Sequence, residues 1–225
     1  VIVEKLSLKE KVNDFIYFLL KLSAYIILPL IGMIAWILIS SSMINGNIST
    51  SVDSISGLFE TIVIFSVPML LFLAFIPLLV KIKIDNKSLN DLGLVFIRNK
   101  KNIIILTLNI LILVAVIFSF CTSNAFNSSE IPAMILHILA IGISEEIMLR
   151  SIVYDEVHSK FNTVISVIIT SLIFAFIYHS GSDWQSNLLI RFPLGVILSI
   201  LRIKTNNIYS SILFHSWYNM LVLIL

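Results

Sequence analysis

The sequence predicts an all-α protein, a polytopic bundle of transmembrane helices with about seven spans. Of its 225 residues, 58% are hydrophobic and only 12% are charged, which is about half the charged fraction of an average soluble domain. Several apolar stretches reach the roughly 20 residues that a helix needs to cross the hydrocarbon core of a bilayer. In lipid, helices satisfy the backbone hydrogen bonds of such stretches within each segment, so we expect every span to be helical.

Hydropathy places seven spans along the chain. They are predicted at Phe15–Ile39, Leu58–Val80, Ile103–Cys121, Ile131–Tyr154, Phe161–His179, Leu188–Ile203 and Ile208–Leu225. The first span is of full length and no small-residue cleavage pattern follows it, so we interpret it as an anchor and not as a cleavable signal peptide. We expect one integral membrane domain over residues 1–225, with the N-terminal spans in 1–125.

The loops between these spans alternate in positive charge. Lys5, Lys9 and Lys11 precede the first span, whereas the loop from Ser40 to Gly57 contains no Lys or Arg. The next loop carries Lys81, Lys83, Lys87, Arg98, Lys100 and Lys101. The positive-inside rule therefore predicts a cytoplasmic N-terminus and an extracytoplasmic C-terminus. The Ile-, Asn- and Lys-rich composition suggests a bacterial plasma membrane.

The charge pattern also limits the partners. The formal net charge is only +2 and the 15 Lys and Arg residues are dispersed among the loops. They form no basic block that could follow a phosphate backbone, which argues against nucleic acid. The expected partners are the lipid bilayer and a peptide or protein associated with the membrane.

Three ionisable residues interrupt the fourth span: Glu145, Glu146 and Arg150. Each costs about 2.5–3.5 kcal/mol near the centre of a membrane helix, so they need partners or a function. Glu146 and Arg150 are four residues apart and can pair on one helix face. Glu145 lies about 100° around the helix and remains available as a general base. A buried ion network that only fixes helix packing is the alternative, but one Arg cannot neutralise two carboxylates.

Polar residues in the fifth and seventh spans can reach the same depth as Glu145. The fifth span ends at His179, and the seventh contains His215 with Asn219 one turn later on the same face. Glu145 and His179 each lie roughly 25 Å along their helices from a turn near Phe161. We therefore expect a polar site between spans four, five and seven, although a lone histidine at a span end is often only interfacial.

This set of side chains suits peptide hydrolysis. A carboxylate can activate water, imidazoles can hold a metal or a second proton, and an amide can stabilise an oxyanion. A divalent metal such as zinc would be held by Glu145, His179 and His215, although the chain has no HExxH motif. His137 and Asn109 are interpreted as polar residues that pack helices together.

The same residues resemble the pattern of the CPBP family, which includes the CAAX-type prenyl proteases and the bacteriocin-processing Abi proteins. That pattern is EExxxR, then FxxxH, then a His followed four residues later by Asn or Asp. The first and third motifs match at Glu145, Glu146, Arg150, His215 and Asn219. His179 fits the second, but Ala175 occupies its Phe position, with Phe174 and Phe176 on either side. The likeness covers about the last hundred residues, so 126–225 is interpreted as a CPBP-like catalytic core.

The resemblance implies a role for each motif residue. Glu145 would activate water, His179 and His215 would assist the water or bind a metal, and Asn219 would steady the oxyanion. Glu146 and Arg150 would hold the arrangement. The implied function is that of an intramembrane endopeptidase, a hydrolase acting on a membrane-associated or lipidated peptide, and a bound metal would make it a metalloprotease.

Two other functions compete with proteolysis. A non-catalytic scaffold for bacteriocin immunity, or for the regulation of a partner membrane protein, is the alternative within the same resemblance. A transporter that uses Glu145 and Glu146 as proton or cation sites is disfavoured because the chain shows no internal repeat.

Overall fold

The computed structural model describes residues 8–45, 57–96, 98–123 and 129–225. Lys5 and the central parts of the first and third loops lie outside these ranges. Over the described residues the chain forms seven continuous helical stretches, several of which include π-helical segments, here labelled η. The stretches are α1 (Leu8–Asn45); α2, η2, η3 and α3 (Leu58–Thr61, Ile62–Ser66, Met69–Phe75, Ile76–Lys83); α4 (Lys100–Thr122); α5, η4 and α6 (Ile131–Glu146, Ile147–Val153, Tyr154–His158); α7 and η5 (Thr163–Ile173, Phe174–Tyr178); α8, η6 and α9 (Trp184–Ser186, Asn187–Arg191, Phe192–Thr205); and α10 (Tyr209–Ile224).

The seven predicted apolar segments therefore correspond to seven helical stretches, and the all-helical fold is confirmed for the described chain. Five stretches are long and apolar enough to cross a membrane: Leu8–Ile44, Leu58–Lys83, Lys100–Thr122, Ile131–His158 and Trp184–Thr205. The other two are shorter. α10 has 16 residues, which corresponds to about 24 Å against a hydrocarbon core of roughly 30 Å. The protein is an integral membrane protein whose described residues include five helices of spanning length, and the count of seven spans is not confirmed.

Side-chain caps determine where several helices begin. Asn99 accepts a hydrogen bond from the backbone N–H of Asn102, at the start of α4. Asn162 does the same for Ile165 at the start of α7, which fixes the turn between the fourth and fifth stretches. These side chains satisfy N–H groups that would otherwise lack partners at a helix N-terminus.

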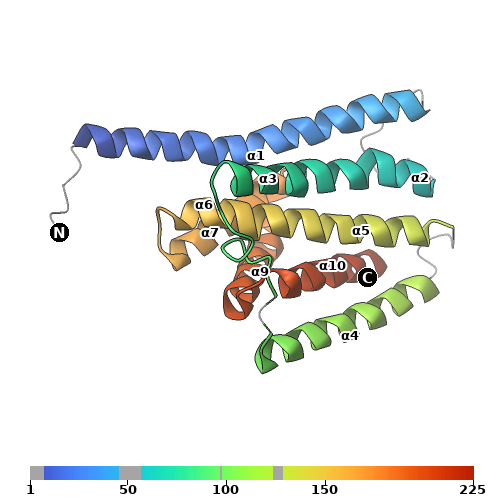
Figure 1. The fold of residues 1–225 in the computed structure, drawn as a ribbon. Helices are drawn as coiled ribbons and strands as arrows, with labels where there is room; N and C mark the ends of the chain where they lie inside the picture. Colours follow the sequence, from blue (N-terminus) through green and yellow to red (C-terminus); the bar gives the residue numbers. More distant parts are fainter. Residues whose placement is uncertain (1–7, 46–56, 97, 124–128) are drawn as a thin grey trace.

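The helices are arranged as a row with further helices behind it (Figure 1). α1 forms one edge of the row, followed by α2–α3, α5 and α10, with α4 at the opposite edge; the packing of neighbouring elements agrees with this order. α7 packs against α9, and α9 also packs against α10. This arrangement places the fourth stretch in the middle of the bundle, and it is the most buried of the five helices of spanning length in the described chain.

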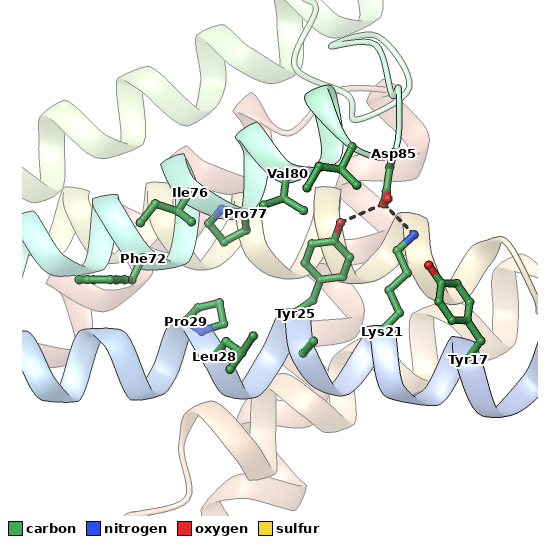
Figure 2. Close-up of a pocket in the computed structure, with 12 residues that line it drawn as sticks. Tyr17, Lys21, Tyr25, Leu28, Pro29, Phe72, Ile76, Pro77, Val80 and Asp85 are labelled. Carbon is green, nitrogen blue, oxygen red and sulfur yellow. Dashed lines mark hydrogen bonds and ion pairs between the residues drawn. The ribbon is translucent and has the colours of Figure 1, made fainter.

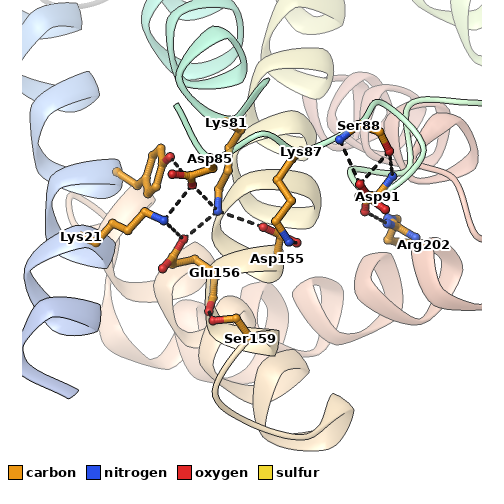
Figure 3. Close-up of polar contacts among 11 residues, drawn as sticks. Lys21, Lys81, Asp85, Lys87, Ser88, Asp91, Asp155, Glu156, Ser159 and Arg202 are labelled. Carbon is orange, nitrogen blue, oxygen red and sulfur yellow. Dashed lines mark hydrogen bonds and ion pairs between the residues drawn. The ribbon is translucent and has the colours of Figure 1, made fainter. Parts of the chain in front are cut away.

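A buried ion network joins α1, α3 and α6 near one end of the bundle (Figure 3). Its centre is Lys81, whose side chain is only 1% exposed. The Lys81 Nζ lies 2.7 Å from Glu156, 2.9 Å from Asp155 and 3.2 Å from Asp85. Lys21 on α1 pairs with Asp85 and Glu156 at 2.8 and 3.2 Å. The network therefore connects the first two helical stretches to the fourth.

The loop that follows α3 packs against the second half of the chain through its own backbone. Leu92 is fully buried, and its carbonyl accepts a hydrogen bond of 2.6 Å from Ser151 Oγ. The carbonyl of Gly93 accepts one from the N–H of Ile208 at 3.0 Å. The carbonyl of Leu94 accepts a hydrogen bond of 2.6 Å from the hydroxyl of Tyr209. Three consecutive residues of this loop therefore serve as acceptors.

Replacing Lys81 should weaken the fold strongly. We expect Lys81→Met to lower the free energy of unfolding by about 3–5 kcal/mol, because it leaves buried carboxylates without their central cation. Lys83→Met is the matched control, since Lys83 is exposed at the end of the same helix and its loss should change stability by less than about 0.5 kcal/mol. Unfolding in mixed micelles with increasing SDS measures both. Equal stability of the two variants would contradict the structural role of Lys81.

The network should also make stability depend on pH. Burial alone raises the pKa of Asp85, but the hydrogen bonds from Lys21, Tyr25 and Lys81 outweigh it and lower the pKa below its usual value. A carboxylate with a lowered folded-state pKa stabilises the fold above its unfolded pKa of about 3.9, and this stability is lost as the pH falls through the folded pKa. Melting temperatures of the wild type should therefore fall below about pH 4. Asp85→Asn should be less stable at pH 7 and lose less on acidification, whereas identical pH profiles would contradict this assignment.

Candidate functional site

The residues singled out in the fourth stretch are among the most buried polar groups of the described chain. Glu146 and Arg150 are fully buried, and Glu145 is 7% exposed. His215, from α10, is 1% exposed. A fully buried charge is costly unless it is paired. We therefore expect these four side chains to pair with one another.

A glycine allows α5 and α10 to approach closely enough for this pairing. A Cβ atom on Gly142 would lie 2.3 Å from Ser216 Oγ and 3.3 Å from the backbone oxygen of Ile212, so no larger residue fits without a shift. Gly142 is one turn before Glu146, and Ser216 is next to His215. The close contact therefore brings the carboxylate and the imidazole to the same level.

Glu146 is shared by two partners. Its Oε1 lies 3.1 Å from His215 Nδ1, and its Oε2 lies 3.4 Å from Arg150 Nε. The predicted pairing of Glu146 with Arg150 is confirmed, and the contact with His215 adds to it. Because a carboxylate only accepts hydrogen bonds, His215 Nδ1 must carry the hydrogen. In the neutral ring the lone pair is then on Nε2.

The His215 Nε2 atom faces the second carboxylate. It lies 3.9 Å from Glu145 Oε2, which is too long for a direct hydrogen bond. Glu145 Oε2 is buried and has no hydrogen-bond partner within the described residues. A separation of this size between two polar groups is suited to a bridging water molecule.

Arg150 connects this cluster to two further helices. One guanidinium nitrogen, Nη2, donates a hydrogen bond of 3.2 Å to the carbonyl of Gly195 on α9. The guanidinium carbon lies 4.9 Å from the centre of the Phe174 ring at the start of η5, within the range of a cation–π contact. Arg150 therefore fixes the positions of α9 and η5 relative to Glu146.

Phe174 also contacts both histidines. Its ring centre lies 4.7 Å from that of His179 and 5.6 Å from that of His215, edge-to-face in both cases. The departure from the FxxxH motif has a local cause. η5 is a π-helical turn, which spaces equivalent positions about five residues apart instead of four, so Phe174 and not Ala175 takes the aromatic position before His179.

The hydrogen bond at His179 determines which of its nitrogens is available. His179 Nδ1 lies 2.9 Å from the carbonyl oxygen of Phe174. A carbonyl can only accept, so Nδ1 carries the hydrogen and Nε2 of the neutral ring keeps its lone pair. His179 makes no hydrogen bond or ion pair with Glu145 in the part of the chain that the structure describes. Phe174 lies between them, because its ring contacts His179 on one side and His215, which faces Glu145, on the other.

His179 and Asn219 line a cavity of about 410 Å³ between α5, η5, α8, η6, α9 and α10. Most of its walls are apolar, with Ile138, Ile141, Phe174, Ile190, Leu194, Tyr218, Val222 and Leu223 alongside the polar His179, Ser186, Arg191 and Asn219. The predicted residues thus form two adjoining groups. A buried group holds Glu145, Glu146, Arg150 and His215, and a cavity next to it holds His179 and Asn219.

A larger groove of about 440 Å³ lies elsewhere, between α1 and the helix that ends in α3 (Figure 2). Lys21, Tyr25 and Asp85 meet at one end of this groove, and apolar side chains line the rest. None of the motif residues borders it. We therefore assign the candidate site to the cavity beside His179.

The predicted metal site was tested against the donors present. Across the residues that the structure describes, no three His, Cys, Asp or Glu side chains are grouped so that they could hold a metal ion. Glu145, His179 and His215 therefore do not fit a three-ligand zinc site as they are arranged. The metal stays a prediction from the sequence, and we derive no chemical step through it.

Two packing assignments from the sequence agree with the structure. His137 Nδ1 lies 3.2 Å from Ser66 Oγ, and its ring packs edge-to-face on Phe65. Asn109 accepts a hydrogen bond of 3.1 Å from the indole N–H of Trp217. Both residues join neighbouring helices and lie outside the cavity.

Three polar residues near the site were not anticipated. The hydroxyl of Tyr178 is buried and has no hydrogen-bond partner among the described residues, and it is close enough to Glu145 for the two to interact electrostatically. Asn187 is 2% exposed, and Arg191 lines the cavity. The signal for the last two was present, since both are polar residues in an apolar helix.

Comparison with known proteins gives one result. A family model described as type II CAAX prenyl endopeptidase Rce1-like matches residues 127–221. No curated protein and no solved structure matches the chain. The matched segment contains the buried group and every residue that lines the cavity except Val222 and Leu223, and it begins just before α5.

The assignment of the aromatic position can be tested by substitution. Phe174→Ala should lower the free energy of unfolding by about 3–5 kcal/mol, because its ring is 1% exposed and packs against Arg150 and both histidines. Phe176→Ala is the matched control. Its ring is 38% exposed, so the loss should be below about 1 kcal/mol. SDS titration of the purified variants measures the difference, and the reverse order would show that Phe176 holds the aromatic position.

Proposed function

We propose that the chain is a member of the Rce1-like family of type II CAAX prenyl endopeptidases, whose model matches residues 127–221, and that it hydrolyses a peptide bond in a membrane-associated or lipidated peptide. The observation that carries this proposal is the 3.9 Å gap between Glu145 Oε2 and His215 Nε2. A water molecule that bridged the two atoms would contact Glu145 Oε2, which has no hydrogen-bond partner among the described residues, and an imidazole nitrogen with a free lone pair.

In the proposed reaction, Glu145 is the general base. It takes a proton from the water as the water oxygen attacks the carbonyl carbon of the peptide bond. The resulting tetrahedral intermediate collapses with cleavage of the C–N bond, and Glu145 returns the proton to the leaving nitrogen. His215 orients the water through Nε2, and Glu146 fixes the tautomer of His215 by accepting from Nδ1.

The remaining motif residues act on the substrate side. Asn219 carries an amide that can donate a hydrogen bond to the developing oxyanion. His179 lies in the same cavity with Nε2 available to the substrate or to the water. Arg150 touches no substrate in this scheme. It is a positioning residue that neutralises Glu146 and holds α9 and η5 in place.

The substrate enters from the lipid in this proposal. The apolar walls of the cavity suit a peptide tail with hydrophobic side chains or an attached lipid, and an intramembrane position brings such a tail to the site without removing it from the bilayer. We retain the orientation predicted from loop charge, with the N-terminus in the cytoplasm, and a seven-span topology in which α7–η5 and α10 cross as short helices.

Loss of the general base should abolish cleavage while the protein still accumulates in the membrane. Removing such a group costs a factor of about 10² to 10⁴ in rate, so Glu145→Gln and His215→Ala should both fall to background. Purified protein in lipid nanodiscs is tested with a quenched fluorescent peptide that carries an S-farnesyl cysteine followed by three apolar residues. Mass spectrometry of the peptides from cells with intact or Glu145→Gln protein identifies natural products.

His158→Ala is the control for the histidine substitution. His158 is exposed at the end of α6, outside the cavity, and its loss should leave cleavage unchanged. If peptides are cleaved as fast by Glu145→Gln as by the wild type, the water-activation scheme is wrong. A cellular phenotype that persists in both Glu145→Gln and His215→Ala would favour the scaffold function.

A further inference from the structure

The groove between α1 and the helix that ends in α3 is apolar along most of its length and polar at one end (Figure 2). Its volume is about 440 Å³. Among its lining residues Tyr25 is only 6% exposed, whereas Leu28 and Ile84 are 64% and 70% exposed. Both walls belong to stretches long enough to span a membrane. The groove is therefore open on the side where lipid surrounds the bundle.

A close helix contact ends the groove on its apolar side. Phe72 lines the groove, and a Cβ atom on Gly32 would lie 2.5 Å from its ring, so α1 and η3 touch at this level. At the other end, the hydroxyl of Tyr25 and the ammonium of Lys21 reach Asp85 at 2.9 and 2.8 Å. The groove is thus bounded by a contact of two helices and by a polar cluster.

The length of the groove matches one leaflet of a bilayer. Lys21 and Gly32 are eleven residues apart on α1, which is about 16 Å along the helix axis. The hydrocarbon core is about 30 Å thick, so each leaflet fills about 15 Å of it. Lys81 and Lys83 in the last turn of α3 mark the polar end as the edge of the apolar region. An acyl chain of one leaflet therefore fits between the two ends of the groove.

The polar end can offer a hydrogen-bond donor and an acceptor to a ligand in the groove. An ammonium group has three N–H donors. Lys21 directs two of them to Asp85 and Glu156, at 2.8 and 3.2 Å, so one remains for a ligand. The contacts of Asp85 with Tyr25, Lys21 and Lys81 are all made by Oδ2. Its Oδ1 can therefore accept a further hydrogen bond.

Tyr17 adds a second donor beside Lys21. It lies one turn earlier on α1, lines the groove and points its hydroxyl toward the same end (Figure 2). The charges around this end balance one another, because the ion network contains three lysines and three carboxylates: Lys21, Lys81, Lys87, Asp85, Asp155 and Glu156. An anionic headgroup gains no net attraction there, whereas a headgroup with one phosphate and one ammonium matches the donors and the acceptor.

We propose that this groove binds a phospholipid of the surrounding leaflet whose headgroup carries both a phosphate and a primary ammonium, as in phosphatidylethanolamine. The phosphate accepts hydrogen bonds from Lys21 and Tyr17, and the ammonium donates to Asp85 Oδ1. One acyl chain lies along the groove as far as Phe72. The bound lipid connects α1 with α3 beside the buried ion network, and its binding does not depend on the proposed peptidase reaction.

The test measures the binding of lipids to the full chain in detergent micelles by native mass spectrometry. Three lipids with the same acyl chains are offered at equal concentration: phosphatidylethanolamine, phosphatidylcholine and phosphatidylglycerol. The choline headgroup keeps the positive charge but has no N–H to donate, and the glycerol headgroup has a phosphate and no cation. We expect phosphatidylethanolamine to bind about tenfold more tightly than either of the others.

Leu28→Trp fills the apolar part of the groove and leaves its polar end intact. It should weaken the binding of phosphatidylethanolamine by about tenfold or more, because several methylene groups of the acyl chain lose their contacts. Ile27→Trp is the matched control, since Ile27 is the neighbouring residue, is 52% exposed and does not line the groove. Its substitution should leave binding unchanged. Tyr17→Phe removes one donor to the phosphate and should weaken binding by about threefold.

Three results would overturn the assignment. Tighter binding of phosphatidylglycerol would show that the site takes an anionic lipid. Equal binding of the three lipids, binding of none, or binding of phosphatidylethanolamine that is unchanged in both Leu28→Trp and Tyr17→Phe would show that the groove does not select this headgroup. A dimer without bound lipid that dissociates with Leu28→Trp but not with Ile27→Trp would show that a second copy of the chain fills the groove.

Discussion

The whole arrangement depends on the burial of one arginine in an apolar bundle. Arg150 is fully enclosed, and a cation in such surroundings is tolerated only beside an anion. Glu146 supplies the negative charge four residues earlier on the same helix, and its second oxygen then binds His215. Both oxygens of Glu146 therefore face a partner, whereas Glu145 makes no hydrogen bond among the described residues. The need to neutralise a structural charge thus separates two adjacent, chemically identical residues into a supporting group and one that can serve as the base in the proposed reaction.

Much of this could be predicted from the sequence because the membrane restricts the choices. An apolar segment of spanning length has to be helical, and all seven predicted segments are helical in the described chain. The i,i+4 rule gave the pairing of Glu146 with Arg150. The distances of Glu145 and His179 from the turn near Phe161 predicted that spans four and five reach the same depth. In the structure, Phe174 contacts both Arg150 of the fourth stretch and His179 of the fifth.

What the sequence did not reveal depends on details smaller than a helical turn. The π-helical turn at η5 moves the aromatic position from Ala175 to Phe174, and a residue pattern read at four-residue spacing cannot show such a change. The first and fourth stretches are joined to the second by a network centred on Lys81, which hydropathy interprets only as a loop charge. Arg191 and Asn187 were visible as polar residues, but the cavity that gives them meaning forms only when η6 packs beside η5 and α10.

The loop that follows α3 is held in a way that constrains its evolution. Leu92, Gly93 and Leu94 are attached to the bundle through main-chain oxygens, which every amino acid possesses. Exchanges of neighbouring side chains therefore leave these attachments in place. A residue added or deleted in the loop would move all three acceptors out of register with Ser151, Ile208 and Tyr209. Among homologues, this segment should accordingly keep its length and its glycine at position 93, whose φ of +69° and closeness to Arg202 leave no room for a Cβ, while its exposed neighbours vary.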